Sequence, residues 1–158
     1  MTQIGEQQAG TDPTLHGEVP AQRAAIVRIR GMVPDLPGLM GGAFQATAAA
    51  IGRGGAHVSG PPFARYLTMH EPFEAEVGFP FVGGLEATDG IEIVDLPGGR
   101  VVTVRHLGSY DTVGETWDRA AAWIGEHGLT VLGPPWECYL TGPDEPGPPI
   151  TEIVWPVG

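Results

Sequence analysis

The pattern of apolar and polar residues occurs twice along this chain. Residues 40–68 and 113–141 align without a gap at an offset of 73, and thirteen of their 29 pairs are identical. Shared composition alone gives about two or three matches over such a length. The segments Gly60–Leu67 and Gly133–Leu140 are near copies. The pattern therefore predicts a duplicated structure whose halves carry the same elements in the same order.

Alternating residues predict the strands of both halves. Gln22–Arg30 alternates in a way typical of a strand with one buried face. On one side fall Ala25, Val27 and Ile29, and on the other fall Ile26, Arg28 and Arg30. The predicted strands are Gln22–Arg30, Phe63–Met69, Phe73–Phe81, Ile91–Leu96, Arg100–His106, Trp136–Leu140 and Ile150–Val157.

Helical spacing predicts one helix in each half. In Leu39–Ile51 the apolar stripe is Met40, Phe44, Ala48 and Ile51. The second helix opens at Thr112, which with Glu115 has capping-box spacing, and Gly128 stands at its C-terminal cap. Its predicted apolar face is Val113, Trp117, Ala120, Ala121 and Ile124. Each half thus reads strand–helix–strand–strand, which favours an α+β fold with helices on one face of a largely antiparallel sheet.

Composition bounds the domains and the partners. Residues 1–17 are polar and predict a disordered tail before one domain at 18–158, with pseudo-repeats at about 18–82 and 91–158. The net charge of −11 argues against nucleic acid and anionic membranes as partners. We expect a cytoplasmic protein, because the chain shows no signal peptide or bilayer-length apolar run and has a single cysteine. No metal-ligand spacing or cofactor motif is present, so neither metal nor cofactor is expected.

Three ordered motifs resemble the GyrI-like small-molecule-binding family, which also forms the effector-binding half of many AraC- and MerR-type regulators. They are His106–Tyr110, Gly133–Tyr139 and Thr151–Ile153 with Pro156–Val157, and the resemblance covers about Val19 to Val157. It implies a curved sheet with two helices on its outer face and a central groove that binds ligands. With only the polar tail outside the domain, we expect a stand-alone member without a helix-turn-helix.

Alternation divides the strand at Trp136–Leu140 between two faces. Trp136, Cys138 and Leu140 are expected to pack under the helices, whereas Glu137 and Tyr139 line the groove. In the other half, Ala64 and Tyr66 are the groove residues. Arg65 falls on the face assigned to the core, and we expect it to reach solvent at an edge.

Glu137 is the main candidate site residue because its counterpart in the first half is Ala64. Its carboxylate is expected beside the rings of Tyr66 and Tyr139, with Trp136 as a further candidate ring. This combination suits a hydrophobic cation, because aromatic faces attract cations. The resemblance assigns the same role to an acid at this position. The alternative is an ion pair of Glu137 with Arg105 or Arg28, or a solvated strand carboxylate.

Tyr110 and two glutamates are further candidate site residues with two interpretations each, and His106 has one. Tyr110 either leans over the groove mouth and binds ligand or packs against the helix start. Glu76 and Glu152 either add negative potential to the groove or are surface charges, and His106 is expected to hydrogen-bond its loop.

Two functions follow as hypotheses. The first is a multidrug-type binding protein, monomeric or weakly dimeric, that sequesters hydrophobic, often cationic compounds and contributes to drug resistance. The second is a hydrolase of strained, cyclopropane-bearing genotoxins, which the family resemblance suggests, with Glu137 activating water and Tyr139 assisting. Inhibition of a topoisomerase, suggested by the family name, has no support in these residues.

Overall fold

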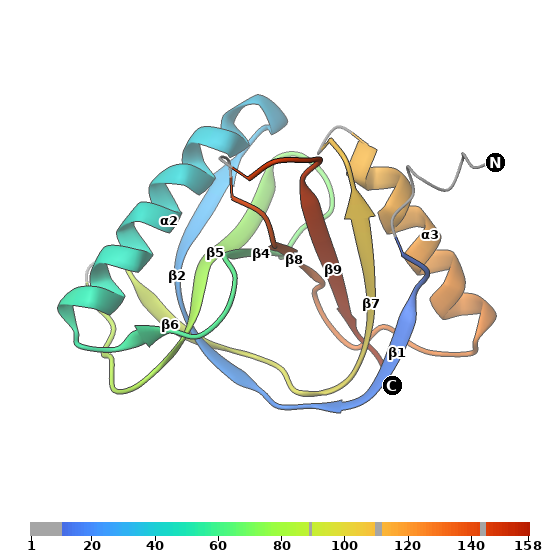
Figure 1. Cartoon of the computed structure of the whole chain (residues 1–158), viewed down its shortest axis with the longest axis horizontal. Coiled ribbons are helices and arrows are strands. Elements are labelled where there is room, and N and C mark those ends of the chain that lie inside the picture. Colours follow the sequence, from blue (N-terminus) through green and yellow to red (C-terminus); the bar gives the residue numbers. More distant parts are fainter. Residues whose placement is uncertain (1–10, 89, 110–111, 143–144) are drawn as a thin grey trace. The chain divides into compact units, whose positions relative to one another are not determined.

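The chain folds into two compact units. The computed structural model describes residues 11–88, 90–109, 112–142 and 145–158. The N-terminal unit is Pro20–Pro97, and the C-terminal unit combines Met1–Val19 with Gly98–Gly158. Each is an antiparallel sheet with one long helix packed on one of its faces, so the fold is α+β as predicted (Figure 1).

The N-terminal unit has sheet order β4-β5-β2-β6, and α2 packs on β2 and β5. The short β3 pairs with the end of β5. The elements are β2 (Gln22–Gly31), η1 (Val33–Asp35), α2 (Leu36–Arg53), β3 (His57–Val58), β4 (Phe63–Tyr66), β5 (Phe73–Val82) and β6 (Glu92–Leu96).

The C-terminal unit has sheet order β1-β7-β9-β8, and α3 packs on β7. Its elements are β1 (Thr14–Val19), β7 (Gly99–Leu107), α3 (Val113–Glu126), β8 (Trp136–Tyr139) and β9 (Ile150–Pro156). β1 precedes β2 in the chain but pairs with β7, and β6 precedes β7 but pairs with β2. β1, which precedes β2 in the chain, therefore belongs to the C-terminal unit, and β6, which precedes β7, belongs to the N-terminal unit.

Strand register confirms the duplication. Val27 lies opposite Val77 on the β2–β5 pair, and at the matched place Val104 lies opposite Ile153 on the β7–β9 pair. β4 pairs with β5 as β8 pairs with β9. Because a slip of one residue would exchange the two faces of a strand, identical registers place matched residues on matched faces.

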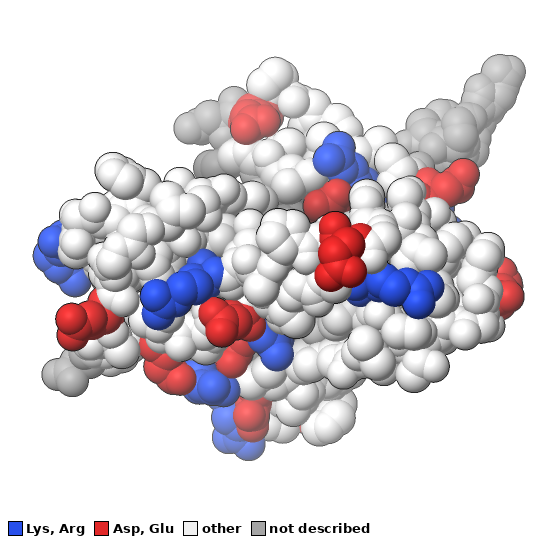
Figure 2. All heavy atoms as spheres, turned by 90° about the horizontal axis from the view of Figure 1, so that it is seen from below, with Lys and Arg blue, Asp and Glu red and all other residues white. Residues whose placement is uncertain are grey.

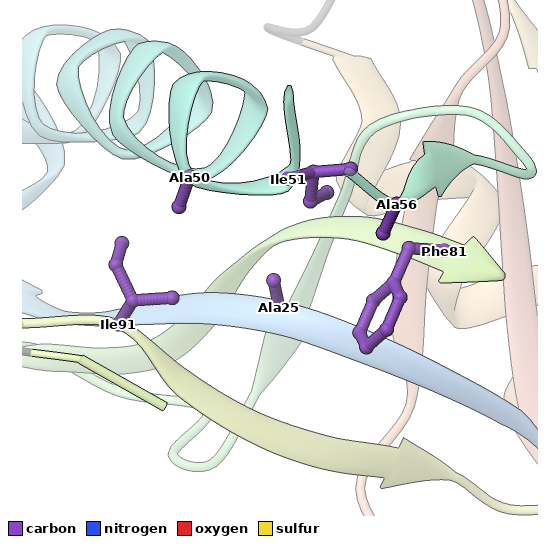
Figure 3. Packing of buried hydrophobic residues seen from close by; sticks show 6 residues of the cluster. All are labelled: Ala25, Ala50, Ile51, Ala56, Phe81 and Ile91. Carbon is purple, nitrogen blue, oxygen red and sulfur yellow. The ribbon is translucent and has the colours of Figure 1, made fainter. Parts of the chain in front are cut away.

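The core of the N-terminal unit lies between α2 and the sheet (Figure 3). Ala25 is fully buried and packs toward Ala50 and Ile51 of α2, as predicted. The prediction that β2 has a single buried face is wrong, because Ala24 and Ile26 on its other face are also fully buried. Phe81 closes one end of the cluster and Ile91 lies at the other end in the same view. Small residues on both α2 and β2 let helix and sheet approach closely.

In the C-terminal unit, Val104, Ala120 and Ile153 form one core cluster, and Val102, Ile124 and Val157 form a second. The predicted apolar face of α3 is confirmed at Ala120 and Ile124, whereas Ala121 is exposed and Thr116 is buried. Gly128 directly follows the C-cap residue His127 and has a φ of 69°, so it supplies the left-handed conformation predicted for the end of this helix.

The predictions for the N-terminal segment and for the cap of α3 are wrong. Residues 1–17 were expected to be a disordered tail, but Thr14–Gly17 belong to β1, which pairs with β7 from Thr14 opposite Thr103. Strand pairing satisfies their backbone groups despite their polar side chains. Thr112 is the N-cap residue of α3 without forming the capping bond, because its hydroxyl donates to Ser109 O at 3.0 Å.

Ion pairs occupy the sheet face turned away from each helix. In the N-terminal unit the buried Glu76 forms ion pairs with Arg28 at 3.2 Å and with Arg65 at 3.7 Å. In the C-terminal unit Arg105 pairs with Glu152 at 3.3 Å. Positive and negative side chains lie beside one another on the surface in Figure 2. The prediction that Arg65 lies on the core face under the helix is therefore wrong, because it lies on the opposite face beside Glu76.

Replacing Glu76 with Ala is expected to lower the free energy of unfolding by about 3 kcal/mol, because Arg65 would lose its buried counter-charge. Urea denaturation followed by circular dichroism measures this change. The control is Glu74→Ala, whose partner Arg30 is exposed, and it is expected to cost less than about 1 kcal/mol. Equal losses in the two variants would contradict the assignment.

Candidate functional site

The face that Glu137 occupies is set by the β8–β9 register. Glu137 lies directly opposite Ile153, and Ile153 packs against Ala120 of α3. Directly opposed residues of antiparallel strands share a face, so Glu137 and Tyr139 point toward α3. The predicted faces of this strand are therefore wrong in both directions: Trp136 and Cys138 were expected under the helices, and Glu137 and Tyr139 were expected on the opposite face.

Both oxygens of Glu137 accept a hydrogen bond from an aromatic side chain. Trp117 Nε1 on α3 donates to Oε2 at 2.6 Å, and the Tyr139 hydroxyl donates to Oε1 at 2.8 Å. Glu137 itself is only 5% exposed. Hydrogen bonds to an ionised group are roughly twice as strong as neutral ones, and these two offset part of the cost of removing the carboxylate from water.

Aromatic rings form the wall beside this carboxylate. Trp117 meets Trp155 of β9 edge to face, with ring centroids 5.4 Å apart. Trp117, Tyr139 and Trp155 are each partly exposed, so solvent reaches the rings although Glu137 is buried. The C-terminal unit therefore holds a negative charge behind partly open aromatic surface.

His106 lies on the same face and organises the loop before α3. Its Nε2 donates to Ser109 O at 2.9 Å, and its Nδ1 accepts from the Thr116 hydroxyl at 2.7 Å. The backbone carbonyl fixes which nitrogen carries the proton, since it can only accept. The prediction that His106 bonds its loop is confirmed, and both ring nitrogens are used.

The other predicted site residues fall in different places. Ala64 and Tyr66 belong to the N-terminal unit, on the face of β4 turned toward α2, and Tyr66 contacts Phe73 edge to face. Trp136 is buried on the far face of β8, opposite Val154. Tyr110 lies outside the described residues. The structure brings Glu137 and Tyr139 together and does not place Trp136 with them.

Trp117 is a site residue that the sequence pattern missed. It was predicted only as part of the apolar face of α3, yet its indole N–H bonds Glu137. The available signal was its pairing with Phe44 in the duplication, because tryptophan adds one hydrogen-bond donor that phenylalanine lacks.

The proposed ion pair of Glu137 with Arg105 or Arg28 is wrong. Arg105 bonds Glu152, and Arg28 bonds Glu76 and Glu92, all on the opposite face from the helix. Glu76 and Glu152 are therefore ion-paired carboxylates of that face. Glu137 lies on the face toward α3 and takes no part in these ion pairs with Arg28 and Arg105.

The surface of the N-terminal unit also carries a pocket, of about 840 Å³. The exposed Arg23 and Arg53 line it together with Leu85, and the Arg23 guanidinium lies 5.7 Å from the centre of the Phe81 ring. Glu86 also lines the pocket, so two guanidinium groups face one carboxylate and the net positive charge of the lining disfavours a cationic ligand there. We therefore place the candidate cation site at Glu137.

Comparison with known proteins gives a family. The family model described as "GyrI-like small molecule binding domain" matches residues 18–158. No curated protein matches the chain. Within the described residues no helix is long and apolar enough to cross a membrane.

Solved structures share the fold at low sequence identity. The C-terminal domain of EcmrR aligns with a TM-score of 0.80 and 18% identity over 93% of this chain and 97% of its own. SAV2435 bound to tetraphenylphosphonium aligns with a TM-score of 0.64 and 13% identity over 94% of each chain. A hydrolase from Listeria innocua aligns with a TM-score of 0.63 and 14% identity over 98% of this chain and 95% of its own.

Cys138, next to Glu137 in the chain, is expected to react slowly with thiol reagents. Burial, with Glu152 and then Glu137 adding negative charge, raises the pKa of its thiol to about 12 from 9.0. The thiol therefore contributes stability below pH 9 that is lost as the pH rises toward 12. At pH 8, labelling by 5,5′-dithiobis(2-nitrobenzoic acid) is expected to be about 10³-fold slower in the folded than in the guanidinium-unfolded protein. Equal rates with intact circular dichroism would contradict this.

Proposed function

The chain belongs to the GyrI-like small-molecule binding domain family, and from this premise we propose that it binds hydrophobic organic cations beside Glu137 and holds them without chemical change. The observation that supports this proposal is the Glu137 carboxylate, 5% exposed and bonded by Trp117 and Tyr139. Ala64, Tyr66 and Tyr110 remain predictions outside this proposal. Trp136 is no longer a predicted contact, because it is buried on the far face of β8.

A buried carboxylate attracts a cation strongly because little water screens it. At a separation of about 5 Å and an effective dielectric constant of about 20, the attraction between unit charges is about 3 kcal/mol. Contact of the cation with the faces of Trp117, Tyr139 or Trp155 adds roughly 0.5–2 kcal/mol for each ring. The two hydrogen bonds hold the carboxylate in place before the ligand arrives, so little ordering is needed on binding.

Aromatic surface discriminates weakly among apolar cations. Ring contacts are tolerant of ligand shape, whereas strict selectivity needs several directed hydrogen bonds. We therefore expect loose, micromolar binding of many hydrophobic cations, which is the property a sequestering protein for drug-like compounds requires. SAV2435, which has a similar fold, is bound to such a cation, tetraphenylphosphonium.

Wild-type protein is expected to bind tetraphenylphosphonium, and Glu137→Gln is expected to bind it at least about tenfold more weakly, because the amide keeps the shape of the side chain but removes its charge. Isothermal titration calorimetry measures both affinities.

Two controls separate charge from folding. Glu152→Gln removes a carboxylate from the other face of the same sheet, and it is expected to leave the affinity unchanged. Neutral triphenylphosphine oxide is expected to bind wild type and Glu137→Gln equally. Affinity for tetraphenylphosphonium that is the same in wild type and Glu137→Gln would end the cation-site proposal.

A hydrolase is the second candidate, favoured by the 2.8 Å hydrogen bond between Tyr139 and Glu137. A carboxylate can take a proton from water while the water oxygen attacks a strained ring carbon, and the cleaved carbon–carbon bond leaves its electrons on a carbon that Tyr139 protonates. Mass spectrometry of an activated cyclopropane substrate detects the product, which is heavier by one water. Turnover that Glu137→Gln abolishes would favour catalysis over sequestration.

A further inference from the structure

Thr151 carries a buried hydroxyl on the same face as Glu137. It lies on β9 directly opposite Tyr139 of β8, and its exposure is 0%. Within the described part of the chain, Thr151 Oγ1 has no hydrogen-bond partner. A hydroxyl buried without a partner costs about 1–3 kcal/mol, so its position calls for a physical reason.

The neighbours of Thr151 bond elsewhere. Tyr139 on one side donates its hydroxyl to Glu137. His106 on the other side lies directly opposite Thr151 on β7, and both of its ring nitrogens bond the loop before α3 and the Thr116 hydroxyl. Thr151 is thus flanked by polar side chains whose groups are engaged with other partners.

The duplication shows that packing does not require this hydroxyl. The residue at the matched position of the N-terminal unit is Ala75, which lies opposite Tyr66 just as Thr151 lies opposite Tyr139. Ala75 is 1% exposed and packs without any polar group. The same framework therefore folds with a methyl group where the C-terminal unit has a hydroxyl.

We propose that Thr151 donates a hydrogen bond to the ligand, whose entry uncovers this hydroxyl, and that the preferred ligands are hydrophobic cations carrying a hydrogen-bond-accepting oxygen. This inference rests on the proposed function, because it places the cationic centre of the ligand beside Glu137. On the sheet, Thr151 is the diagonal neighbour of Glu137, and such neighbours are about 7–8 Å apart. The acceptor oxygen and the cationic centre of the ligand are thus separated by about one aromatic ring.

Two matched phosphonium ions test this chemistry. (4-Acetylphenyl)triphenylphosphonium carries a carbonyl oxygen about one ring from phosphorus, and (4-isopropylphenyl)triphenylphosphonium has nearly the same shape without an acceptor. Calorimetry gives the ratio of their affinities for wild type, Thr151→Val and Thr151→Ser. Wild type is expected to prefer the acetyl compound by about fivefold, Thr151→Ser to keep that preference, and Thr151→Val to lose it.

Thermal unfolding without ligand is the second measurement. Valine has the shape of threonine but no hydroxyl, so Thr151→Val is expected to raise the unfolding midpoint by about 2 °C while it removes the preference. A hydroxyl with a purely structural role would instead make Thr151→Val less stable and leave the ligand preference unchanged.

The outcomes separate the two proposals. If wild type binds both phosphonium ions equally, the role of Thr151 is overturned and the cation site at Glu137 stands. Preference for the acetyl compound that persists in Thr151→Val overturns the role of Thr151 in the same way. If wild type binds neither ion, both proposals are overturned.

Discussion

A carboxylate held out of water by two aromatic donors is the interaction on which the layer between α3 and its sheet depends. Trp117 reaches Glu137 from α3, and Tyr139 reaches it along β8. The contact requires α3 to be packed on the sheet and β8 to be in register with β9. Helix packing, strand register and the position of the charge are therefore one coupled constraint, and a slip of one residue in β8 would turn Glu137 to the other face.

The duplication allows the two units to be compared position by position. The registers are the same, and an edge-to-face aromatic pair recurs at matched positions: Phe44 with Phe79 in one unit, and Trp117 with Trp155 in the other. The differences are chemical. Where the C-terminal unit has Glu137, the N-terminal unit has Ala64. The architecture is thus shared, and the polar groups of the layer under α3 are additions to it.

The sequence was sufficient to predict the duplication, most strands and the α+β class, because the repeat is read directly from the residues and runs such as 102–106 alternate between buried and more exposed positions. The faces of β8 were not predictable in this way. Trp136 and Glu137 are both buried, so neither polarity nor size tells which of them lies under α3. Glu137 was found because it differs from Ala64, whereas its partner Trp117 was hidden by its apolar bulk.

The face of Arg65 was also not predictable from its own strand. It was assigned to the core because its neighbours Phe63 and Leu67 are apolar, and the carboxylate that accommodates it, Glu76, lies on another strand. Alternation within one short strand carries no information about a charge supplied by its neighbour. The pairing of β4 with β5 shows which face Arg65 occupies, because it places Arg65 directly opposite Glu76.

Stability and binding make opposite demands on the layer under each helix. In the N-terminal unit Ala25, Ala50 and Ile51 fill this layer with hydrocarbon, which is the arrangement that folding alone favours. In the C-terminal unit the layer contains a buried charge and a hydroxyl, at Glu137 and Thr151, each with a desolvation cost. Proteins break the rules of core composition mainly where a site requires it. Because both units share one framework, folding alone does not require the polar layer under α3, and under the proposed function a bound cation would offset the desolvation of that layer.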